Sequence, residues 1–474
     1  MDIPTRLTVL LISSAFLPSC SGDDGGGGGD GGGDQHAICS PLTYGAVGDS
    51  VTDNTVALQK AVDACAAQGG GIVELSAVGE NDVYVAGPFT LKSHVHLYID
   101  EGVTLRATND HSRFAPSYIN WVYQSNGALI SAKGATDVGI MGEGTIDGAS
   151  DQADPNDGGR TWYDVAVAES ATNPSTRPFL IEFYQCDGVT ISGVTIRNHP
   201  YWAQALRFSR NVVEFGVTID GQGRNSDGVD LVGVTNATLS DLDISVSDDN
   251  IAIKSGLPVS PSHAYHEKEI GLPQLPTSNV LISNIVARTG QGISIGSETA
   301  NGVNNVTIEN VTFTNTKYGF RIKTARDRGS EIRDIHVRNL VMDGVGWPIG
   351  IDSYLYSPIG PDPHGPAHPI TPTTPDVHDI LIEGVVATNS TGQSHVRGLP
   401  ESCIKDVTLR NVSIETGGKG IHLLHMSGTF DNVTSTSSQP NPPFVVEENV
   451  DVTTAGTTPT ISPTPPLAGQ TACE

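Results

Sequence analysis

The residues best suited to chemistry in this chain of 474 residues are three aspartates in two short polar stretches. Asp227 lies in NSDGVD (residues 225–230), and Asp248 and Asp249 lie in SDDNIAIKSG (residues 247–256). Grouped carboxylates raise one another's proton affinity, so that one stays protonated while another is ionised. Glycoside hydrolysis needs both states, because an acid protonates the leaving oxygen and a base activates water.

Two further polar stretches follow along the chain. GQGISIGS (residues 290–297) carries no acid but contains Gln291, and RIK contains Arg321 and Lys323. On the same face as the aspartates, this basic pair would hold a substrate carboxylate, because guanidinium and ammonium groups both pair with carboxylates. Salt screens charges beyond ~8–10 Å, so a local basic subsite is compatible with an acidic protein.

A repeated pattern must position these stretches. From residue 95 onward, a valine or isoleucine after a turn residue opens two short strand-like runs, as in NVTIENVTF (residues 305–313) and DVTLRNVSI (residues 406–414). Eight copies follow one another at steps of 23, 25, 43, 26, 29, 45 and 27 residues. Alternating runs without helical periods between them exclude βαβ units, and one turn of chain per repeat is typical of a solenoid.

We therefore predict an all-β fold, a right-handed single-stranded parallel β-helix, with a β-sandwich or propeller as the alternative. The 54 glycines suit many short turns, and stacked asparagines such as Asn211, Asn279 and Asn305 suit its corners. Residues 55–68 have apolar side chains at helical spacing. We expect this helix to cap the open first coil, because solenoid ends need covering.

The repeat brings the polar stretches to one face. Asp227 and Asp248 are 21 residues apart, about one coil, which predicts neighbouring strands ~4.8 Å apart. The two long steps contain Pro-rich insertions, at residues 257–276 and 356–375, each with about 18 to 20 residues beyond an ordinary coil. We expect them to flank a groove, and hypothesise that they wall one end of it and make cleavage exo-acting.

These stretches resemble the polygalacturonase family of pectin-cleaving glycoside hydrolases, glycoside hydrolase family 28. The resemblance extends from about Leu42 to the Tyr354 region, and includes GEGTIDG (residues 142–148), NHPYW (residues 198–202), NSDGVD, SDDNIAIKSG, GISIGS and RIKT. It implies a parallel β-helix, no metal or cofactor, and inverting hydrolysis of a pectic, uronate-containing polysaccharide.

The resemblance also assigns roles to residues. Asp248 would be the general acid, and Asp227 and Asp249 would activate the water. Substrate would be bound by the residues Asn225, Gln291, Arg321, Lys323 and Tyr354, with Arg321 and Lys323 on a uronate carboxylate.

One motif departs from the family pattern. The family has glycine-histidine-glycine where this chain has Gly290-Gln291-Gly292. Glutamine hydrogen-bonds to a carboxylate but does not titrate, so it cannot tune the acid as histidine would. The departure puts ordinary homogalacturonan in doubt and leaves room for a branched or modified pectin such as rhamnogalacturonan, or for an impaired enzyme.

Two weaker signals have two interpretations each. His364 and His368 lie four residues apart in PHGPAHP, but the intervening proline excludes a helical metal pair, which favours a solvated loop. Tyr201 and Trp202 suit either sugar stacking or packing.

The N-terminus reads as an export signal. An eleven-residue apolar run (residues 7–17) is too short to span a bilayer as a helix and is followed by LPSC, which resembles a bacterial lipoprotein box. We predict a lipoprotein-type signal peptide at 1–19, lipidation of Cys20, a Gly/Asp-rich tether at 20–36, and a catalytic domain at 37–474 that becomes Pro/Thr-rich from about 438. A plain secretory signal is the alternative. Either places the protein outside the cytoplasm, secreted or anchored to a bacterial outer membrane or cell surface.

Five further cysteines remain in an oxidising compartment. Cys39 and Cys65 precede the repeats, and Cys403 and Cys473 lie near the C-terminus. We expect pairing within each end, with Cys186 free and buried, although spacing alone does not establish connectivity.

The net charge of the chain limits the classes of molecule that it can bind. The formal net charge is −27, which argues against nucleic acid because phosphate binding needs a basic surface. We expect a monomer that contacts a membrane only through a lipid anchor. Two other functions stay open: a β-helix polysaccharide lyase with aspartate-bound calcium and Lys254 or Arg321 as base, and a non-catalytic carbohydrate-binding β-helix.

Overall fold

The computed structural model describes residues 37–79, 82–114, 127–169, 176–257, 273–355, 362–467, 470 and 472–473. Residues Ala37–Glu474 form one compact unit. The predicted signal peptide, Cys20 and the tether lie outside the described residues, as do residues 258–272 of the first insertion and 356–361 of the second. No helix in the described ranges is both long and apolar enough to cross a membrane.

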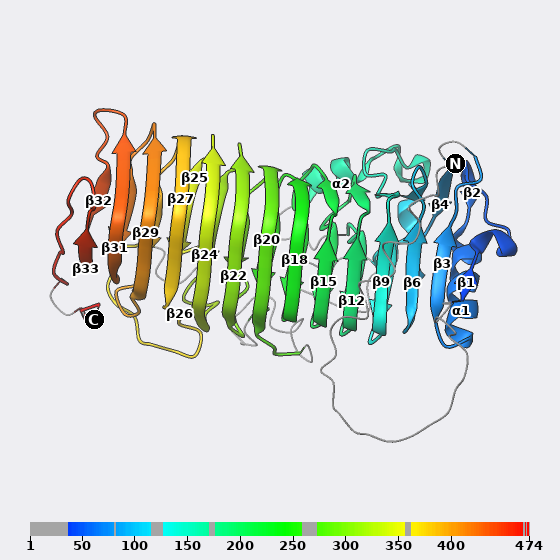
Figure 1. Ribbon diagram of the computed structural model, residues 1–474, viewed down its shortest axis with the longest axis horizontal. Helices are drawn as coiled ribbons and strands as arrows, with labels where there is room; N and C mark the ends of the chain where they lie inside the picture. The colour runs from blue at the N-terminus through cyan, green and yellow to red at the C-terminus, as the bar shows by residue number, and fades with distance from the viewer. Residues whose placement is uncertain are drawn as a thin grey trace, which may run out of the picture. The chain divides into compact units, whose positions relative to one another are not determined.

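The described chain coils into stacked parallel strands, which confirms the predicted parallel β-helix. The long strands of the larger sheet stand side by side in chain order (Figure 1). Apolar residues alternate toward the interior, where Leu231, Ile253 and Ile295 stack in register on successive coils. This inward row makes a continuous core, and the outward positions of the same strands carry the polar residues.

Two sheets contain the strands. The smaller one has twelve strands within the described ranges: β5 (Phe89–Thr90), β8 (Ile130–Lys133), β11 (Ile181–Tyr184), β14 (Gln204–Arg207), β17 (Val229–Val232), β19 (Ile251–Lys254), β21 (Ile293–Gly296), β23 (Tyr318–Lys323), β25 (Trp347–Asp352), β28 (His395–Arg397), β30 (Ile421–Leu424) and β32 (Phe444–Val446).

The larger sheet has twenty-one strands among the described residues: β1 (Ile38–Cys39), β2 (Asp49–Asp53), β3 (Gly71–Leu75), β4 (Val83–Ala86), β6 (Val95–Ile99), β7 (Thr104–Ala107), β9 (Thr136–Gly142), β10 (Thr145–Asp147), β12 (Asp187–Ser192), β13 (Thr195–Arg197), β15 (Arg210–Phe215), β16 (Thr218–Asp220), β18 (Thr235–Ser245), β20 (Thr277–Thr289), β22 (Val303–Thr314), β24 (Glu331–Asp343), β26 (Asp376–Val377), β27 (Ile380–Ser390), β29 (Ile404–Thr416), β31 (Met426–Ser437) and β33 (Val450–Ala455).

Asparagines form a ladder at one corner of the coils, as the sequence predicted. Asn211, Asn236, Asn279 and Asn305 all have φ between 53° and 59°. The amides of Asn236, Asn279 and Asn305 each donate to the asparagine of the coil before, at 3.1, 3.0 and 2.7 Å. Asparagine tolerates this left-handed conformation better than most residues, so the ladder fixes the corner and ties adjacent coils together.

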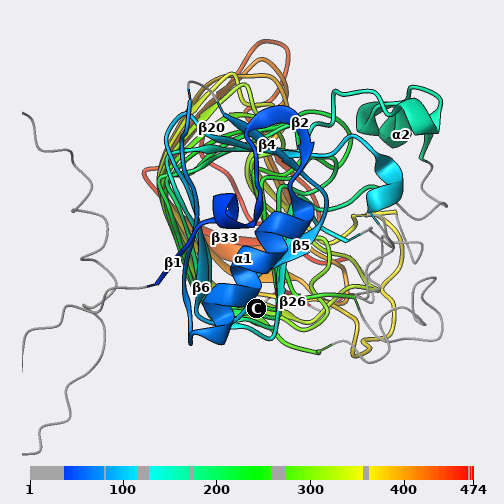
Figure 2. The same ribbon diagram turned by 90° about the vertical axis from the view of Figure 1, so that its right-hand side faces the viewer.

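The first coil is covered by α1 (Thr55–Ala67), which confirms the predicted capping helix. Viewed along the coils, α1 crosses their open end, and α2 (Trp162–Ala168) lies to one side (Figure 2). The helix buries Leu58, Ala61 and Val62 against the core. A disulfide from Cys65 to Cys39 of β1, with Cα atoms 5.8 Å apart, fastens the cap.

The other cysteines divide between a second disulfide and a free thiol. Cys403 pairs with Cys473, 70 residues later, and this disulfide closes the C-terminal end of the solenoid. Cys186 is free and buried. β32 and β33 extend both sheets into the segment after residue 438, so that segment adds a further coil.

Candidate active site

The three aspartates lie in the connections that enter adjacent strands of the smaller sheet. Asp227 precedes β17, and Asp248 and Asp249 precede β19. Because Val229 pairs with Ile251, the residue level with Asp227 is Asp249, and Asp248 lies one position earlier in the same connection. The coil is one residue longer than the 21-residue spacing assumed. One carboxylate oxygen from each of the three lies within 4.8 Å of the others.

Asp249 is the carboxylate that two cations hold. Its Oδ1 accepts from Arg321 Nη2 at 2.6 Å and from Ser294 Oγ at 2.9 Å, and its Oδ2 accepts from Lys323 Nζ at 2.6 Å. Burial alone would raise the pKa of Asp249, but Lys323 and Arg321 outweigh burial and hold that pKa well below its usual range. Asp249 is therefore ionised at neutral pH.

The pKa of Asp248 is shifted in the opposite direction from that of Asp249. Burial raises the pKa of Asp248, and the negative charge of Asp249 raises it further, against the partial opposition of Lys323. Its Oδ1 accepts the backbone N–H of Asp249 at 3.0 Å. Unlike its two neighbours, Asp248 keeps some exposure, so its proton can reach a molecule in front of the sheet.

Asp227 is buried beside a further carboxylate that sequence reasoning missed, Asp230. Burial raises the pKa of Asp227 well above its usual value, and Asp230 and Asp248 add to this effect. Lys254 Nζ lies 2.5 Å from Asp230 Oδ1 and 3.7 Å from Asp227 Oδ2, so it serves mainly Asp230. Burial raises the pKa of Asp230 to about 7 despite that lysine.

The carboxylates in and beside the site outnumber the cations by one. Among the described residues, five carboxylates interact with four cations in and beside the site: Asp227, Asp230, Asp248, Asp249 and Glu298 against Lys254, Arg321, Lys323 and Arg328. Buried groups favour electrical neutrality, because an unpaired charge in a low-dielectric site is costly. One carboxyl of the cluster therefore keeps a proton near neutral pH, and burial raises the pKa of Asp227, Asp230 and Asp248 alike.

The side chain of Gln291 forms a hydrogen bond with Arg321, and not with the carboxylates of the aspartates. Its Oε1 accepts from Arg321 Nη2 at 3.0 Å, and its backbone N–H donates to the Asp248 carbonyl at 2.7 Å. The turn is held by Asn250, whose Oδ1 accepts the N–H of Gly292 at 2.8 Å. The glutamine thus orients a cation without contributing a titratable group.

The two remaining predicted binding residues, Asn225 and Tyr354, form hydrogen bonds with residues other than the three aspartates. Asn225 Oδ1 accepts from Arg177 Nη2 at 3.3 Å, and Asn225 has φ 56°, so it shapes the turn before Asp227. The hydroxyl of Tyr354 donates to the Gly398 carbonyl at 2.8 Å, and burial raises the pKa of Tyr354. Substrate contact by Tyr354 would therefore involve its ring.

Tyr201 and Trp202 are packing residues, the second of the two interpretations. Both are buried, with ring centroids 5.7 Å apart. Trp202 also lies 3.9 Å from Lys254 Nζ, so it forms a wall behind that lysine.

Ser294 and Lys254 also belong to the cluster. The sequence alone did not single out Ser294, and it indicated Lys254 only as the base of the lyase alternative. Ser294 Oγ accepts from Arg321 Nε at 2.8 Å, besides donating to Asp249. The alternation of inward and outward residues along the strands could have identified Asp230 and Ser294. Both occupy outward positions in the same row as Arg321.

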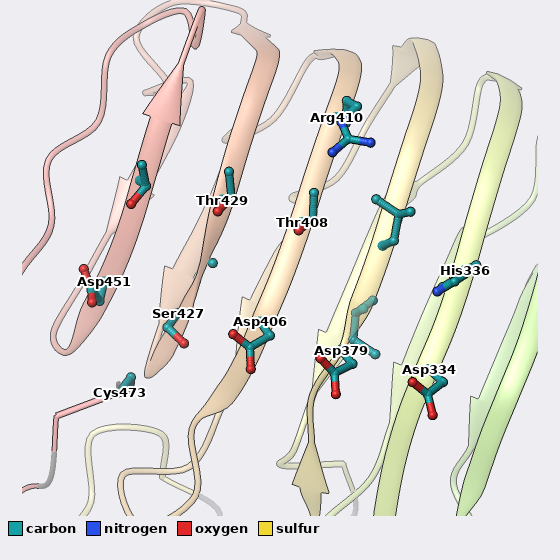
Figure 3. Close-up of a pocket in the computed structure, with 14 residues that line it drawn as sticks. Asp334, His336, Asp379, Asp406, Thr408, Arg410, Ser427, Thr429, Asp451 and Cys473 are labelled. Atoms are coloured by element: carbon teal, nitrogen blue, oxygen red, sulfur yellow. The ribbon is translucent and has the colours of Figure 1, made fainter.

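A hollow of about 590 Å³ on the larger sheet lies apart from this cluster. Figure 3 shows it over strands β24 to β33, lined by Asp334, Asp379, Asp406, Asp451 and polar neighbours. It contains acidic corner residues but lacks the alternation of carboxylates and buried cations found around Asp249. The smaller sheet therefore holds the better candidate for catalysis.

Comparison with known proteins decides the family. Residues 72–439 match the family described as glycosyl hydrolases family 28. The chain belongs to this family. It is similar to an endo-polygalacturonase of Pectobacterium carotovorum subsp. carotovorum, with 32% identity over 369 residues, which covers 76% of this chain and 84% of the relative. An endo-polygalacturonase of Pectobacterium parmentieri is 31% identical over 393 residues, 80% of this chain and 90% of the relative.

A solved structure of polygalacturonase from Erwinia carotovora ssp. carotovora shares the fold. It superposes with a TM-score of 0.67 at 25% identity, covering 90% of this chain and 99% of the other. This family 28 protein is thus a glycosidase, and its carboxylate cluster belongs to an enzyme that hydrolyses glycosidic bonds. Neither the lyase nor the binding-only alternative is favoured by these similarities.

Proposed function

We propose that this family 28 glycosidase hydrolyses a galacturonan-type pectic polysaccharide. The observation that carries the proposal is the contrast between Asp249, ionised between Arg321 and Lys323, and Asp248, whose pKa is raised beside it. Such a pair supplies the base and the acid of glycoside hydrolysis. Both Pectobacterium relatives are endo-polygalacturonases, which supports a galacturonan substrate.

In the proposed mechanism Asp248 donates its proton to the leaving glycosidic oxygen. Asp249 and Asp227, which are level on adjacent coils, hold a water between them, and the ionised Asp249 takes its proton. Positioned proton transfer of this kind typically contributes ~10²–10⁴-fold to the rate. Asp227, with its raised pKa, orients the water and can share the proton of the cluster.

Arg321 and Lys323 are proposed to recognise the uronate while they hold Asp249. A substrate carboxylate that meets both cations would lie beside the ionised aspartate, and the guanidinium has enough N–H groups to serve two carboxylates. Asn225, Gln291 and the ring of Tyr354 complete the proposed substrate contacts. Because Gln291 replaces a titratable histidine, we propose a modified or branched galacturonan as the preferred substrate.

The separation of the carboxylates bears on whether hydrolysis inverts or retains the anomeric configuration. Inverting enzymes usually separate their carboxyl groups by ~6.5–9.5 Å, whereas ~5–5.5 Å is typical of retention. One oxygen from each aspartate here lies within 4.8 Å of the others. Inversion is therefore supported by the family resemblance rather than by the separation. Proton NMR of the first-formed anomer decides it: the inverted anomer is expected, and the retained anomer would overturn the mechanism.

The decisive experiment for the function compares Asp248→Asn with Asp451→Asn, an exposed aspartate on the larger sheet. Reducing-end release from a panel of pectic polymers should fall at least ~10³-fold in Asp248→Asn and stay unchanged in Asp451→Asn. Unchanged release from every polymer in Asp248→Asn would refute the assignment. Sizing the products over time tests the exo-acting hypothesis, because long oligosaccharides early in digestion exclude it.

We also propose an extracytoplasmic, monomeric enzyme anchored through lipid on Cys20. The supporting observation is the apolar run followed by LPSC and a glycine-rich tether. Cys20→Ser should move the protein from the membrane fraction to the soluble extracytoplasmic fraction. An unchanged distribution would leave only the plain secretory signal.

A further inference from the structure

Three histidines and two glutamates gather at the C-terminal end of the smaller sheet. This His/Glu cluster consists of His364, His422, His425, Glu447 and Glu448. His422 lies on β30, in the outward row that runs from Arg321 through Gly350 and His395. Three strand spacings separate it from Arg321, roughly 14 Å along the axis. The cluster therefore shares a face with the active site without touching it.

The polar atoms of the cluster converge. Glu447 Oε2 lies 2.9 Å from His422 Nε2 and 3.7 Å from His364 Nε2. Glu448 Oε1 lies 3.3 Å from His364 Nδ1 and 4.0 Å from His425 Nε2. One ligand atom each from His364, Glu447 and Glu448 lies within 4.8 Å of the other two. Ligand atoms around a tetrahedral zinc ion are about 3.4 Å apart, so small side-chain movements suffice.

The hydrogen bonding of these groups is incomplete. His422 Nε2 and Glu447 Oε2 are buried atoms without a hydrogen bond, although they are only 2.9 Å apart, so the N–H direction does not point at the oxygen. His425 is 0% exposed, its Nε2 lies 4.0 Å from Glu448 Oε1, and the Pro363 backbone is a further polar neighbour of the ring. Buried polar atoms normally have partners, and an ion at their common centre would supply one.

We propose that the His/Glu cluster binds a zinc ion. Imidazole nitrogen with carboxylate oxygen is a donor set that suits zinc. His364, Glu447 and Glu448 bring ligand atoms within 4.8 Å of one another, and His422 Nε2 lies beside Glu447 as a fourth candidate ligand. The fully buried His425 acts as a positioning residue for Glu448. The proline between His364 and His368 excludes a helical pair of those two histidines, but not a site that His364 builds with distant glutamates.

The ion would fasten the second insertion to the coils. His364 belongs to that insertion, and two contacts already hold its neighbourhood. Tyr354 Oη lies 3.4 Å from the Pro363 carbonyl, and the His368 N–H donates to Glu401 at 3.3 Å. Glu447 and Glu448 lie between β32 and β33, in the last coils. A zinc bridge would thus fix a wall beside the proposed groove, about three strand spacings from Arg321.

The test is zinc binding by isothermal titration calorimetry at pH 7.5, on purified protein freed of metal with a chelator. One saturable site per chain is expected, together with a higher melting temperature in zinc and no comparable shift in calcium. His364→Ala combined with Glu448→Gln should weaken binding at least 100-fold. His425→Ala should weaken it about 10- to 100-fold, as loss of a supporting contact does.

Two controls separate this site from the active site. His336→Ala, a histidine on β24 of the larger sheet, should bind zinc as the unaltered protein does. Asp248→Asn should also bind zinc normally, so failure of the proposed hydrolysis leaves this test intact. Absence of saturable binding at 100 µM zinc, or full binding by the double variant, would overturn the site and leave simple histidine–glutamate ion pairs.

Discussion

Arg321 and Asp249 form a buried ion pair, with Nη2 of the arginine 2.6 Å from Oδ1 of the aspartate. Lys323 takes the other carboxylate oxygen at the same distance. The two cations come from one strand, β23, while Asp249 enters β19, two strands away in the sheet. The basic residues expected to bind substrate therefore also keep Asp249, the proposed base, ionised.

Arg321→Gln should impair hydrolysis at low pH more than at neutral pH. Asp249 has a depressed pKa, so its ionised form persists to acid pH, and loss of one cation raises that pKa. The acid limb of the kcat/KM profile should move to higher pH, and kcat should fall at least ~10²-fold because the base is also misplaced. Profiles from pH 3 to 8 measure both effects.

Arg338→Gln is the matched control for that variant. Arg338 pairs with Glu309 on the exposed face of the larger sheet, so its loss should leave the profile unchanged. An acid limb that stays in place in Arg321→Gln would show that Asp249 does not set it.

The sequence allowed the fold to be predicted because few arrangements satisfy its pattern. Val212, Ala237 and Val280 each follow a turn residue at the start of an alternating run, and only stacked coils place all such residues inside. The face shared by the aspartates and RIK followed from counting coils. These inferences needed only the period of the chain.

The sequence did not reveal which charges meet. Spacing places Arg321, Lys323 and Asp249 on one face, but the direction and length of each side chain decide that both cations reach one carboxylate. The pairing of Asp230 with Lys254 was missed for the same reason. The His/Glu cluster joins residues about 80 positions apart, which no local motif connects.

Gln291→His should change both the pH dependence and the substrate preference. A histidine beside the Arg321 guanidinium would have a pKa below its ordinary value, so it is neutral at pH 7 and can accept the same hydrogen bond. We expect kcat/KM on unbranched polygalacturonate to rise about tenfold near pH 7 and to gain a new decline at acid pH. Gln68→His, exposed at the end of α1, should do neither. A loss of activity on every polymer would contradict this expectation.

Asn279→Ala should destabilise the solenoid more than Asn279→Gly. Asn279 has φ 58° and exchanges side-chain hydrogen bonds with Asn236 and Asn305. Both variants lose two hydrogen bonds, about 1 kcal/mol each, but alanine also pays about 1–2 kcal/mol for the left-handed conformation. Urea unfolding of both variants measures the difference. Equal destabilisation would mean that the conformation contributes nothing.

Glu214 is a fully buried ionisable residue inside the coils. It lies on β15 in the inward row between Ile191 and Leu239, and its Oε1 accepts from Gln204 Nε2 at 2.6 Å. Its other oxygen has no hydrogen-bond partner. Burial raises the pKa of Glu214 to about 7, against the opposing effect of the Gln204 hydrogen bond.

Stability should therefore decline as pH rises toward and through 7. The folded state holds the Glu214 proton more tightly than the unfolded state, whose ordinary pKa is 4.5, so this stability is fully present below pH 4.5 and lost above about 7. Glu214→Gln removes the ionisation and should stabilise the protein at pH 8 by up to about 3 kcal/mol, with little change at pH 4.5. Urea unfolding at both pH values measures this, with the exposed Glu415→Gln as control. Equal effects of Glu214→Gln at both pH values would show that Glu214 does not titrate between them.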